Sequence, residues 1–204
     1  HLSLGLGEEN YRFHDHEKLA HYADAACDIE YNFPFGFKEL EGIHSRTDFD
    51  LSNHEKFSSK KLKYFDTQSN ESYIPYVLET SIGVDRMFLA IFSNSLCEEI
   101  LEDGSSRTVL KLPAILSPIK VAVLPLLKKD GLPEIAKEIL KKLKKECTVS
   151  YDEKDAIGRR YRRQDAIGTP ICVTIDHQTI KDQKVTLRDR DTMTQERVKI
   201  KNIN

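Results

Sequence analysis

The feature that most constrains the fold of this chain is residues 73–92, YIPYVLETSIGVDRMFLAIF. The first half is rich in β-favouring residues, and Pro75 near its beginning is typical of a strand start. Gly83 interrupts this pattern. Beyond it, apolar residues recur at helical spacing: Val84, Met87, Phe88 and Ile91. The stretch therefore predicts a strand, a turn and a helix packed on one face, in immediate succession.

Polar side chains gather at this predicted turn. Glu79, Thr80 and Ser81 end the strand, and Asp85 and Arg86 fall in the first helical turn. A carboxylate at a strand end can hold an ammonium group, and an arginine beside it can bind a phosphate or stack on a base. A buried structural ion pair would collect the same residue types, so the cluster alone leaves both interpretations open.

The pattern E-x-S-x-G-x-D-R between a strand and a helix resembles motif 3 of class II aminoacyl-tRNA synthetases. A second block, GFKELEGIHSRTDFDL at residues 36–51, is similar to the glycyl-tRNA synthetases of the homodimeric type. Glu39 and Glu79 also stand at the interval which that family uses. The resemblance implies an antiparallel catalytic-domain sheet and a site that binds glycine and ATP.

The resemblance also implies which residues bind each substrate. Glycine has no side chain, so selectivity requires a grip on its ammonium group and steric closure beyond Cα. The implied glycine-binding residues are Glu79, Thr80, Ser81, Ile82 and Gly83. The implied ATP-binding residues are Glu39, Leu40, Gly83, Val84, Asp85 and Arg86.

The implied reaction is attack of the glycine carboxylate on the α-phosphate of ATP, followed by transfer of glycine to tRNA(Gly). This chemistry depends on positioning and charge neutralisation, so no residue is assigned as an acid or base. Mg²⁺ is expected only as part of the ATP complex, with Glu39 facing it. In the alternative, structural interpretation, Glu39 lies on one face of a sheet strand and binds no ligand. Arg46 and Asp48 are expected to form an ion pair in the pocket wall.

Two departures qualify this resemblance. Thr80 and Ile82 stand where the family more often has proline and alanine. No counterparts of motifs 1 and 2 are found, so we expect a fragment that is inactive alone and belongs to a homodimeric protein. A non-enzymatic synthetase-like accessory or RNA-binding protein is the alternative from a different class, and another amino acid specificity is a third.

The composition fits a globular protein with a real core, because 39% of the 204 residues are hydrophobic and 31% are charged. A formal net charge of −2 gives no global attraction to nucleic acid, so tRNA contacts must be local, and DNA is not expected. Four scattered cysteines indicate free thiols in a reducing, cytoplasmic compartment. No apolar run approaches the roughly 20 residues that span a bilayer, so no membrane partner is expected.

The region before the second block is less informative. Residues 17–26 are expected to form a helix and residues 28–33 a strand. His14, His16 and His21 invite a metal interpretation, but hydrogen-bonded or solvent-facing histidines explain them better. Residues 51–72 are polar and turn-rich, which indicates an exposed hairpin or connector whose lysines form a solvated face.

The expected domains are residues 1–111, the end of a catalytic domain, and residues 112–204, an anticodon-binding domain. A helix continuing through residues 96–99 and a proline-containing linker at residues 110–118 precede the second domain. There the pattern predicts an α/β fold with a mostly parallel or mixed five-stranded sheet. The expected strands lie at 120–126, 148–152, 171–176, 184–190 and 197–200, and the helices at 133–145 and 156–166. We expect the family's final helix to be missing, because the chain stops just beyond the last expected strand.

An arginine cluster in this second domain suggests RNA binding. The candidate tRNA-binding residues are Arg159, Arg160, Tyr161, Arg162, Arg163, Arg188 and Arg190. Arginines can bind the phosphates of an anticodon stem-loop, and the tyrosine can stack on a base. Ion pairs with neighbouring acids are the alternative. The KKLKK run at residues 141–145 is expected on the wet side of a helix.

Overall fold

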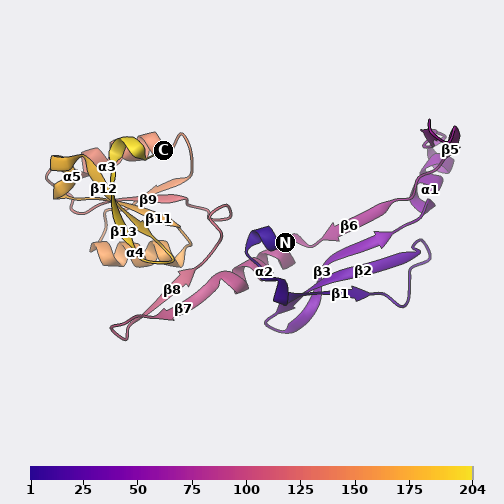
Figure 1. Ribbon diagram of the computed structural model, residues 1–204, viewed down its shortest axis with the longest axis horizontal. Helices are drawn as coiled ribbons and strands as arrows, with labels where there is room; N and C mark the ends of the chain where they lie inside the picture. Colours follow the sequence, from indigo (N-terminus) through magenta and orange to yellow (C-terminus); the bar gives the residue numbers. More distant parts are fainter. Residues whose placement is uncertain (204) are drawn as a thin grey trace. The chain divides into compact units, whose positions relative to one another are not determined.

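The structure is a computed structural model that describes residues 1–203 (Figure 1). The chain divides into two compact units, of which the first is His1–Ser93 and the second begins at Asn94. The division falls before the boundary expected between residues 111 and 112. The difference arises because β8 packs against α4 of the second unit, which brings the β7–β8 hairpin into that unit. No helix of the described residues is long and apolar enough to cross a membrane.

The first unit is built on a four-stranded antiparallel sheet in the order β1-β2-β3-β6. Its strands are β1 (Tyr11–Asp15), β2 (Ala25–Phe33), β3 (Gly36–Ser45) and β6 (Leu78–Ile82). The predicted strand, turn and helix are confirmed, because α2 (Val84–Ser95) begins two residues after β6 ends. Two short 3-10 helices, η1 (Leu2–Leu4) and η2 (Glu8–Asn10), precede the sheet.

Helix α2 packs on a small apolar core. Leu6, Tyr31, Phe33, Leu40 and Ala90 are buried there, with Met87 and Ile91 of α2 against them. The helix was expected to use Val84 and Phe88 on the same face, and this part of the prediction is wrong. Their side chains are 78% and 65% exposed, because Ala90 lies at the centre of the contact and turns both residues outward.

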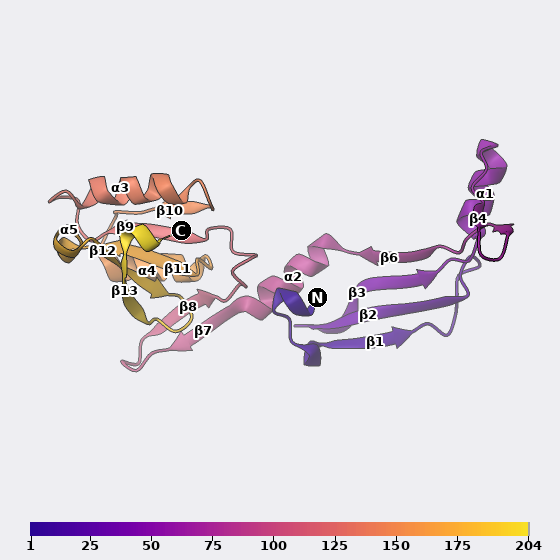
Figure 2. The same cartoon turned by 45° about the horizontal axis from the view of Figure 1, so that its top comes forward.

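A separate segment connects β3 to β6. It contains α1 (Phe49–Ser58) and the hairpin of β4 (Tyr64–Asp66) and β5 (Glu71–Tyr73). None of the residues of these three elements is buried, and the segment extends away from the sheet (Figures 1 and 2). The prediction of an exposed hairpin or connector is confirmed, with a helix added to it.

Two predicted helical stretches are wrong. Residues 17–24 form a connection instead of a helix, and β2 begins at Ala25 because the chain must return to pair Cys27 with Asp15 of β1. Residues 96–99 do not continue α2 but belong to β7 (Leu96–Ile100). The reason is β8 (Ser106–Leu110), which pairs antiparallel with β7 across the predicted turn at residues 103–106.

The second unit contains a five-stranded mixed sheet in the order β10-β9-β11-β12-β13 (Figure 2). Its strands are β9 (Val121–Pro125), β10 (Val149–Tyr151), β11 (Ile171–Ile175), β12 (Lys184–Asp189) and β13 (Gln195–Lys199). The first three in space are parallel and the last two antiparallel, which confirms the predicted α/β class. The helices are α3 (Leu132–Leu143), α4 (Ile157–Ala166), α5 (His177–Asp182) and the 3-10 helix η3 (Ile200–Asn202).

Helices α3 and α4 cover opposite faces of this sheet. Val123 of β9 packs in a cluster with Leu132 and Ile139 of α3. Its neighbours Ala122 and Leu124 point the other way and meet Ile157 and Tyr161 of α4. This alternation of strand side chains explains why both faces of β9 are apolar.

A buried carboxylate ties three elements of the second unit together. Asp165 at the end of α4 is fully buried and accepts hydrogen bonds from Arg188 of β12 at 2.7 and 3.0 Å. Arg107 of β8, also buried, donates to the same carboxylate at 3.0 Å. Asp165 is thus the buried counter-charge of Arg188 and one of two acids that pair with Arg107, the other being Glu99 of β7.

We predict that Asp165→Asn destabilises the protein by about 3–5 kcal/mol, because it leaves the buried Arg188 without its counter-charge and leaves Arg107 with Glu99 alone. Chemical denaturation followed by circular dichroism measures this loss. The matched control is Asp155→Asn, which removes a more exposed partner of Arg163 and is expected to cost less than about 1 kcal/mol. Equal effects of the two substitutions would contradict the account of the buried network.

Asp176 predicts a pH dependence of stability. Burial disfavours its charged form, but hydrogen bonds from Arg197 at 2.7 Å and from the Thr179 amide at 2.9 Å outweigh this and lower its pKa. A lowered folded-state pKa contributes stability above the unfolded value, about 3.9, that is lost as the pH falls through the folded value. Asp176→Asn is therefore expected to be less stable than the parent at pH 7, with a difference that shrinks in acid. A difference independent of pH would contradict this.

Candidate functional site

The pairing of β6 with β3 positions the predicted glycine-binding residues. Glu79 lies directly opposite His44, and Ser81 lies opposite Gly42. Residues paired in this way share one face of a sheet, so Glu79 and Ser81 present their side chains on the same side. Thr80 falls on the other face. The acid and the hydroxyl of the motif are therefore brought together, as a joint grip on one small ligand requires.

Glu79 is held by an arginine from the second motif block. Arg46 Nη1 donates to Glu79 Oε2 at 2.6 Å, and its Nε donates to Asp50 Oδ2 at 2.6 Å. The hydrogen bonds that Arg46 donates, to Asp50 first and to Glu79 second, raise the pKa of Arg46, and the bond to Asp50 lowers the pKa of that carboxyl group. The Arg46 guanidinium also lies over the Tyr22 ring, 4.1 Å from its centroid.

The predicted ion pair between Arg46 and Asp48 is wrong. Asp48 precedes α1 and instead accepts a hydrogen bond from Ser52 Oγ at 3.0 Å. Asp50 takes its place because it lies in the first turn of α1, four residues beyond Arg46. The link from Arg46 to Glu79 was not anticipated, since it depends on the register between two strands that are far apart in the sequence.

Arg86 makes a different contact. Its Nη1 donates to the backbone oxygen of Glu39 at 2.6 Å and to the Glu39 carboxylate at 3.3 Å. Both side chains remain about half exposed, at 52% and 53%. Arg86 and Glu79 are thus bound by separate partners and are not locked to each other, which leaves both available to ligands.

An open pocket of about 510 Å³ lies between the two motif blocks. Its lining contains all six predicted ATP-binding residues together with two of the predicted glycine-binding residues: Glu39, Leu40, Ser81, Ile82, Gly83, Val84, Asp85 and Arg86. Glu79 and Thr80 are not part of this lining. Leu40 is only 1% exposed and belongs to the core beneath the pocket, so its side chain supports the site from below.

Gly83 keeps this pocket open beside Arg86. A Cβ atom at Gly83 would lie 3.7 Å from the aliphatic part of the Arg86 side chain, which is ordinary contact. The fold of the chain itself does not exclude a side chain there. The space that glycine leaves belongs to the pocket, consistent with the close backbone approach expected for a ligand.

The histidines of the first unit do not form a metal centre. His16 pairs with Asp28 at 2.9 Å, and the His14 and His16 rings meet edge to face. Within residues 1–203, no group of three or more histidine, cysteine, aspartate or glutamate side chains could hold a metal ion. The cysteines of this range are all free.

The arginines of α4 have different surroundings. Arg160 is 1% exposed and donates to the backbone oxygens of Pro125, Leu126 and Asp152. Its guanidinium therefore binds the carbonyl groups at the ends of β9 and β10 and has no free face for a phosphate. Arg163 is exposed but paired with Asp152.

Arg188 and Arg190 are also structural in this fold. Arg188 binds Asp165, and its guanidinium covers the ring of Tyr161 at 4.7 Å. Arg190 is 4% exposed and donates to the backbone oxygens of Leu110, Leu112 and Gly168. The Tyr161 hydroxyl is bound to Thr174.

A second open pocket, of about 440 Å³, lies beside α4. Arg159 and Arg162 reach it, and Tyr161 and Arg188 form part of its wall. The Arg159 side chain is exposed and forms no ion pair among the described residues. Of the predicted RNA-binding residues, Arg159 and Arg162 are thus the ones best placed to meet a phosphate.

The anticodon binding domain family matches residues 120–204. Two prolyl-tRNA synthetase structures share the fold. That of Giardia lamblia, in complex with prolyl-adenylate, covers 88% of this chain and 35% of its own at a TM-score of 0.61 and 20% identity. That of Cryptosporidium parvum, complexed with L-proline and AMP, covers 95% and 40% at a TM-score of 0.63 and 16% identity.

Curated relatives are more similar in sequence. The glycine–tRNA ligase of Chlorobaculum tepidum is 52% identical over 196 residues, which is 96% of this chain and 42% of that protein. That of Borrelia hermsii is 50% identical over 204 residues, or 98% and 46%. The chain spans less than half the length of the curated relatives it matches. By these similarities and its two motif blocks, the chain belongs to the glycyl-tRNA synthetase family.

Proposed function

We propose that this chain is part of a glycine–tRNA ligase and carries one wall of the site for glycine and ATP together with the anticodon-binding domain. The observation that carries the proposal is the open pocket between β3 and α2, with Arg86 in its lining and Glu79 two residues before the lining residue Ser81, each held by a separate partner. The names of the curated relatives support the same activity.

In this proposal, glycine lies on the face of β6 that bears Glu79 and Ser81. The Glu79 carboxylate and the Ser81 hydroxyl accept hydrogen bonds from the ammonium group, and the hydrogen bond from Arg46 fixes the position of the carboxylate. The backbone of Thr80, Ile82 and Gly83 closes the space around Cα. Steric closure is needed because a missing methylene-sized contact discriminates by only about 1–3 kcal/mol.

ATP lies in the pocket bounded by Glu39 and Arg86. Arg86 has donors beyond the one that binds Glu39, and these face the nucleotide. Mg²⁺ is commonly held by one or two carboxylates plus substrate phosphates, so the half-exposed Glu39 fits as one ligand of an ATP–Mg²⁺ complex. The glycine carboxylate then attacks the α-phosphate and pyrophosphate leaves, which gives glycyl-adenylate. A hydroxyl of the terminal ribose of tRNA(Gly) attacks the acyl carbon, and AMP leaves.

The anticodon-binding domain places tRNA on the second unit. Arg159 and Arg162 at the pocket beside α4 are our candidates for phosphate contacts. We further propose that the complete protein supplies the rest of the active site, acts as a homodimer and resides in the cytoplasm. Glycine-dependent ATP–pyrophosphate exchange by the complete protein tests the function, and its absence would favour a non-enzymatic synthetase-like protein.

Glu79→Gln is predicted to raise the KM for glycine in that exchange by roughly tenfold or more, because a charged hydrogen bond to the ammonium group is lost. The KM for ATP is expected to change little. Glu98→Gln, an exposed carboxylate on β7, is the control. The assignment fails when the KM for ATP rises as much as that for glycine.

Arg86→Ala is predicted to show the opposite preference, with a KM for ATP raised by roughly tenfold or more and a smaller effect on glycine. Its matched control is Arg12→Ala, since Arg12 is similarly exposed at 54% and also pairs with a glutamate of the same sheet. Similar losses in the two variants would show that the effect is general to exposed ion pairs and not specific to the nucleotide.

A further inference from the structure

The segment between the two motif blocks contains a cationic and aromatic stretch that the proposed site does not use. Residues 56–65 read KFSSKKLKYF, with four lysines, three aromatic residues and no acid. We call this stretch the basic segment. It includes the end of α1, the following turn and the first half of β4. Basic residues interleaved with aromatic ones are typical of surfaces that bind single-stranded nucleic acid.

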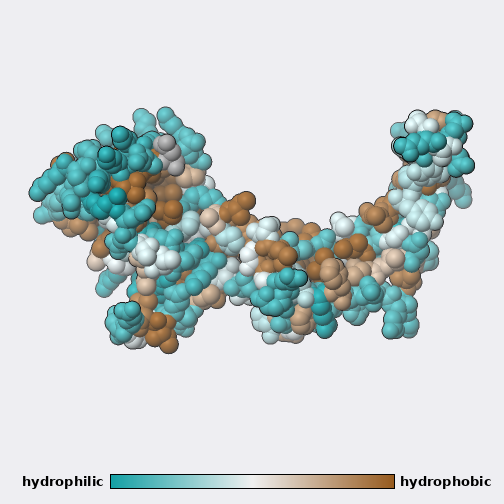
Figure 3. All heavy atoms as spheres, viewed as in Figure 1, coloured by the Kyte–Doolittle hydropathy of each residue, from teal (hydrophilic) through white to brown (hydrophobic). Residues whose placement is uncertain are grey.

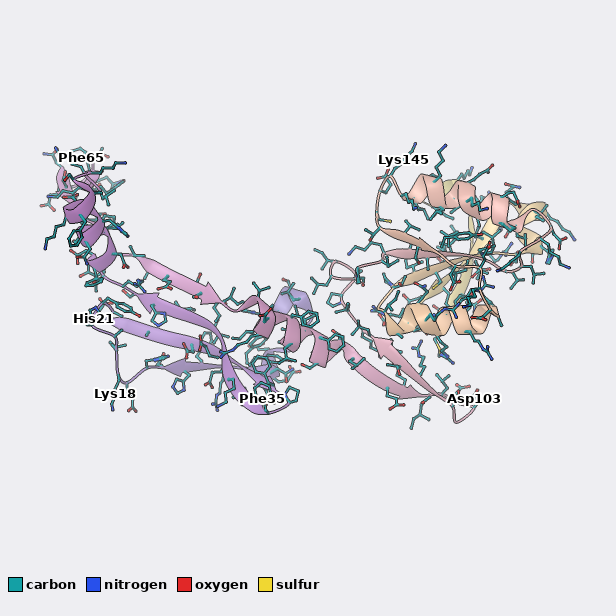
Figure 4. The ribbon with its side chains drawn as sticks, turned by 180° about the vertical axis from the view of Figure 1, so that it is seen from behind. Lys18, His21, Phe35, Phe65, Asp103 and Lys145 are labelled. Atoms are coloured by element: carbon teal, nitrogen blue, oxygen red, sulfur yellow. The ribbon has the colours of Figure 1, made fainter. Side chains whose placement is uncertain are left out.

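The aromatic rings of the basic segment face solvent. Phe57 is 80% exposed, Tyr64 57% and Phe65 51%. Figure 4 shows Phe65 at the end of the projection that lies away from the sheet, and Figure 3 shows the surface around it as largely hydrophilic. Tyr64 meets the Tyr73 ring edge to face with 5.8 Å between the centroids, whereas Phe57 and Phe65 contact no other ring among the described residues. A ligand is therefore a natural source of contacts for these two exposed rings.

The four lysines are not neutralised by the fold. Lys56 lies 5.4 Å from the centre of the Phe57 ring, and none of the four forms an ion pair among the described residues. The two acids that flank the segment are hydrogen-bonded to backbone amides and form no ion pair with a lysine among the described residues. Glu55 accepts a hydrogen bond from the Leu62 amide at 2.8 Å, and Asp66 accepts one from the Gln68 amide at 2.9 Å. A concentrated positive charge therefore remains for an anionic partner.

The basic segment lies on the projection between β3 and β6, and the base of this projection adjoins the proposed glycine site. The Val77 amide donates to the Thr47 oxygen at 2.9 Å, which brings the two ends of the projection together. Asp50 in the first turn of α1 shares Arg46 with Glu79. The projection that carries the basic segment therefore begins and ends beside the residues that would hold the glycyl group before its transfer.

We propose that the basic segment binds the unpaired 3′ end of an RNA and the adjoining phosphates of its stem, guiding that end to the glycine site. The inference rests on the proposed function, which requires a terminal ribose to reach the glycyl-adenylate. Lys60, Lys61 and Lys63 contact phosphates, and Phe57 and Phe65 stack on unpaired bases.

Unpaired lysines alone do not make such a surface. Helix α3 exposes Lys141 and Lys142, and Lys145 is exposed two residues beyond its end, but no exposed aromatic residue lies among them. These lysines belong to the solvent-exposed, polar face of an amphipathic helix and its C-terminal end. They provide a control of equal charge for the basic segment.

The test is direct binding of the 204-residue chain to a labelled RNA stem with an unpaired 3′ tail and no anticodon loop, followed by fluorescence anisotropy. The triple variant Lys60→Ala, Lys61→Ala, Lys63→Ala is expected to bind about tenfold more weakly or worse. It should also reduce the slope of log K against log salt by about 2, since a single-stranded phosphate contact contributes about 0.7. Phe57→Ala is expected to weaken binding of the tailed RNA about fivefold or more.

The control variant Lys141→Ala, Lys142→Ala, Lys145→Ala should bind the tailed RNA as the parent does. Equal losses in the two triple variants, or equal binding of a blunt stem and a tailed stem by the parent, would overturn the inference. Glycine-dependent exchange by the complete protein distinguishes the two proposals. Absence of exchange contradicts the proposed function, whereas intact exchange with unaltered RNA binding by the variants contradicts only the role of the basic segment.

Discussion

The antiparallel pairing of β3 with β6 is the interaction on which the first unit depends. It brings together two motif blocks that are separated by the whole projecting segment, and its register decides which side chains share a face. That register places Arg46 within reach of Glu79 and leaves Glu39 within reach of Arg86. A shift of one residue would turn Glu79 to the other face and dismantle both contacts, because side chains alternate along a strand.

The second unit shows how differently arginines of one cluster can be used. Arg160 and Arg190 are buried and saturate backbone oxygens, and Arg188 shares Asp165 with Arg107. These contacts stabilise the fold, and they also hold α4 against the sheet so that its exposed arginines point outward. A run of arginines in a sequence therefore cannot be read as one RNA-binding surface, since neighbours on a helix have opposite environments.

Much of this architecture could be predicted from the sequence. The alternation of strands and helices after residue 119 and the strand–turn–helix at the proposed ATP pocket follow from the apolar pattern, which has a helical period in α3 and is a continuous run in β9. The resemblance of two motif blocks supplied all eight residues that line the pocket, Glu39 and Arg86 among them. Local patterns were sufficient wherever the nearest neighbours in space are also near in sequence.

Predictions failed where distant pairing decides the outcome. The stretch before Ala25 has helix-favouring residues, yet it serves as a connection because β2 must pair with β1. Leu96–Ile100 is a strand because β8 offers a partner, and Arg46 contacts Asp50 and Glu79 because α1 and β6 bring both to it. These outcomes depend on tertiary partners that no local window contains.

The central claim is that β6 and the first turn of α2 hold glycine against a nucleotide. A crystal structure of the complete protein with a non-hydrolysable glycyl-adenylate analogue tests it most directly. The account predicts that the amino group of the analogue lies within hydrogen-bond distance of the Glu79 carboxylate and the Ser81 hydroxyl, with Arg86 against the nucleotide. An analogue bound with its amino group remote from Glu79, while Arg46 and Glu79 remain paired, would contradict the account.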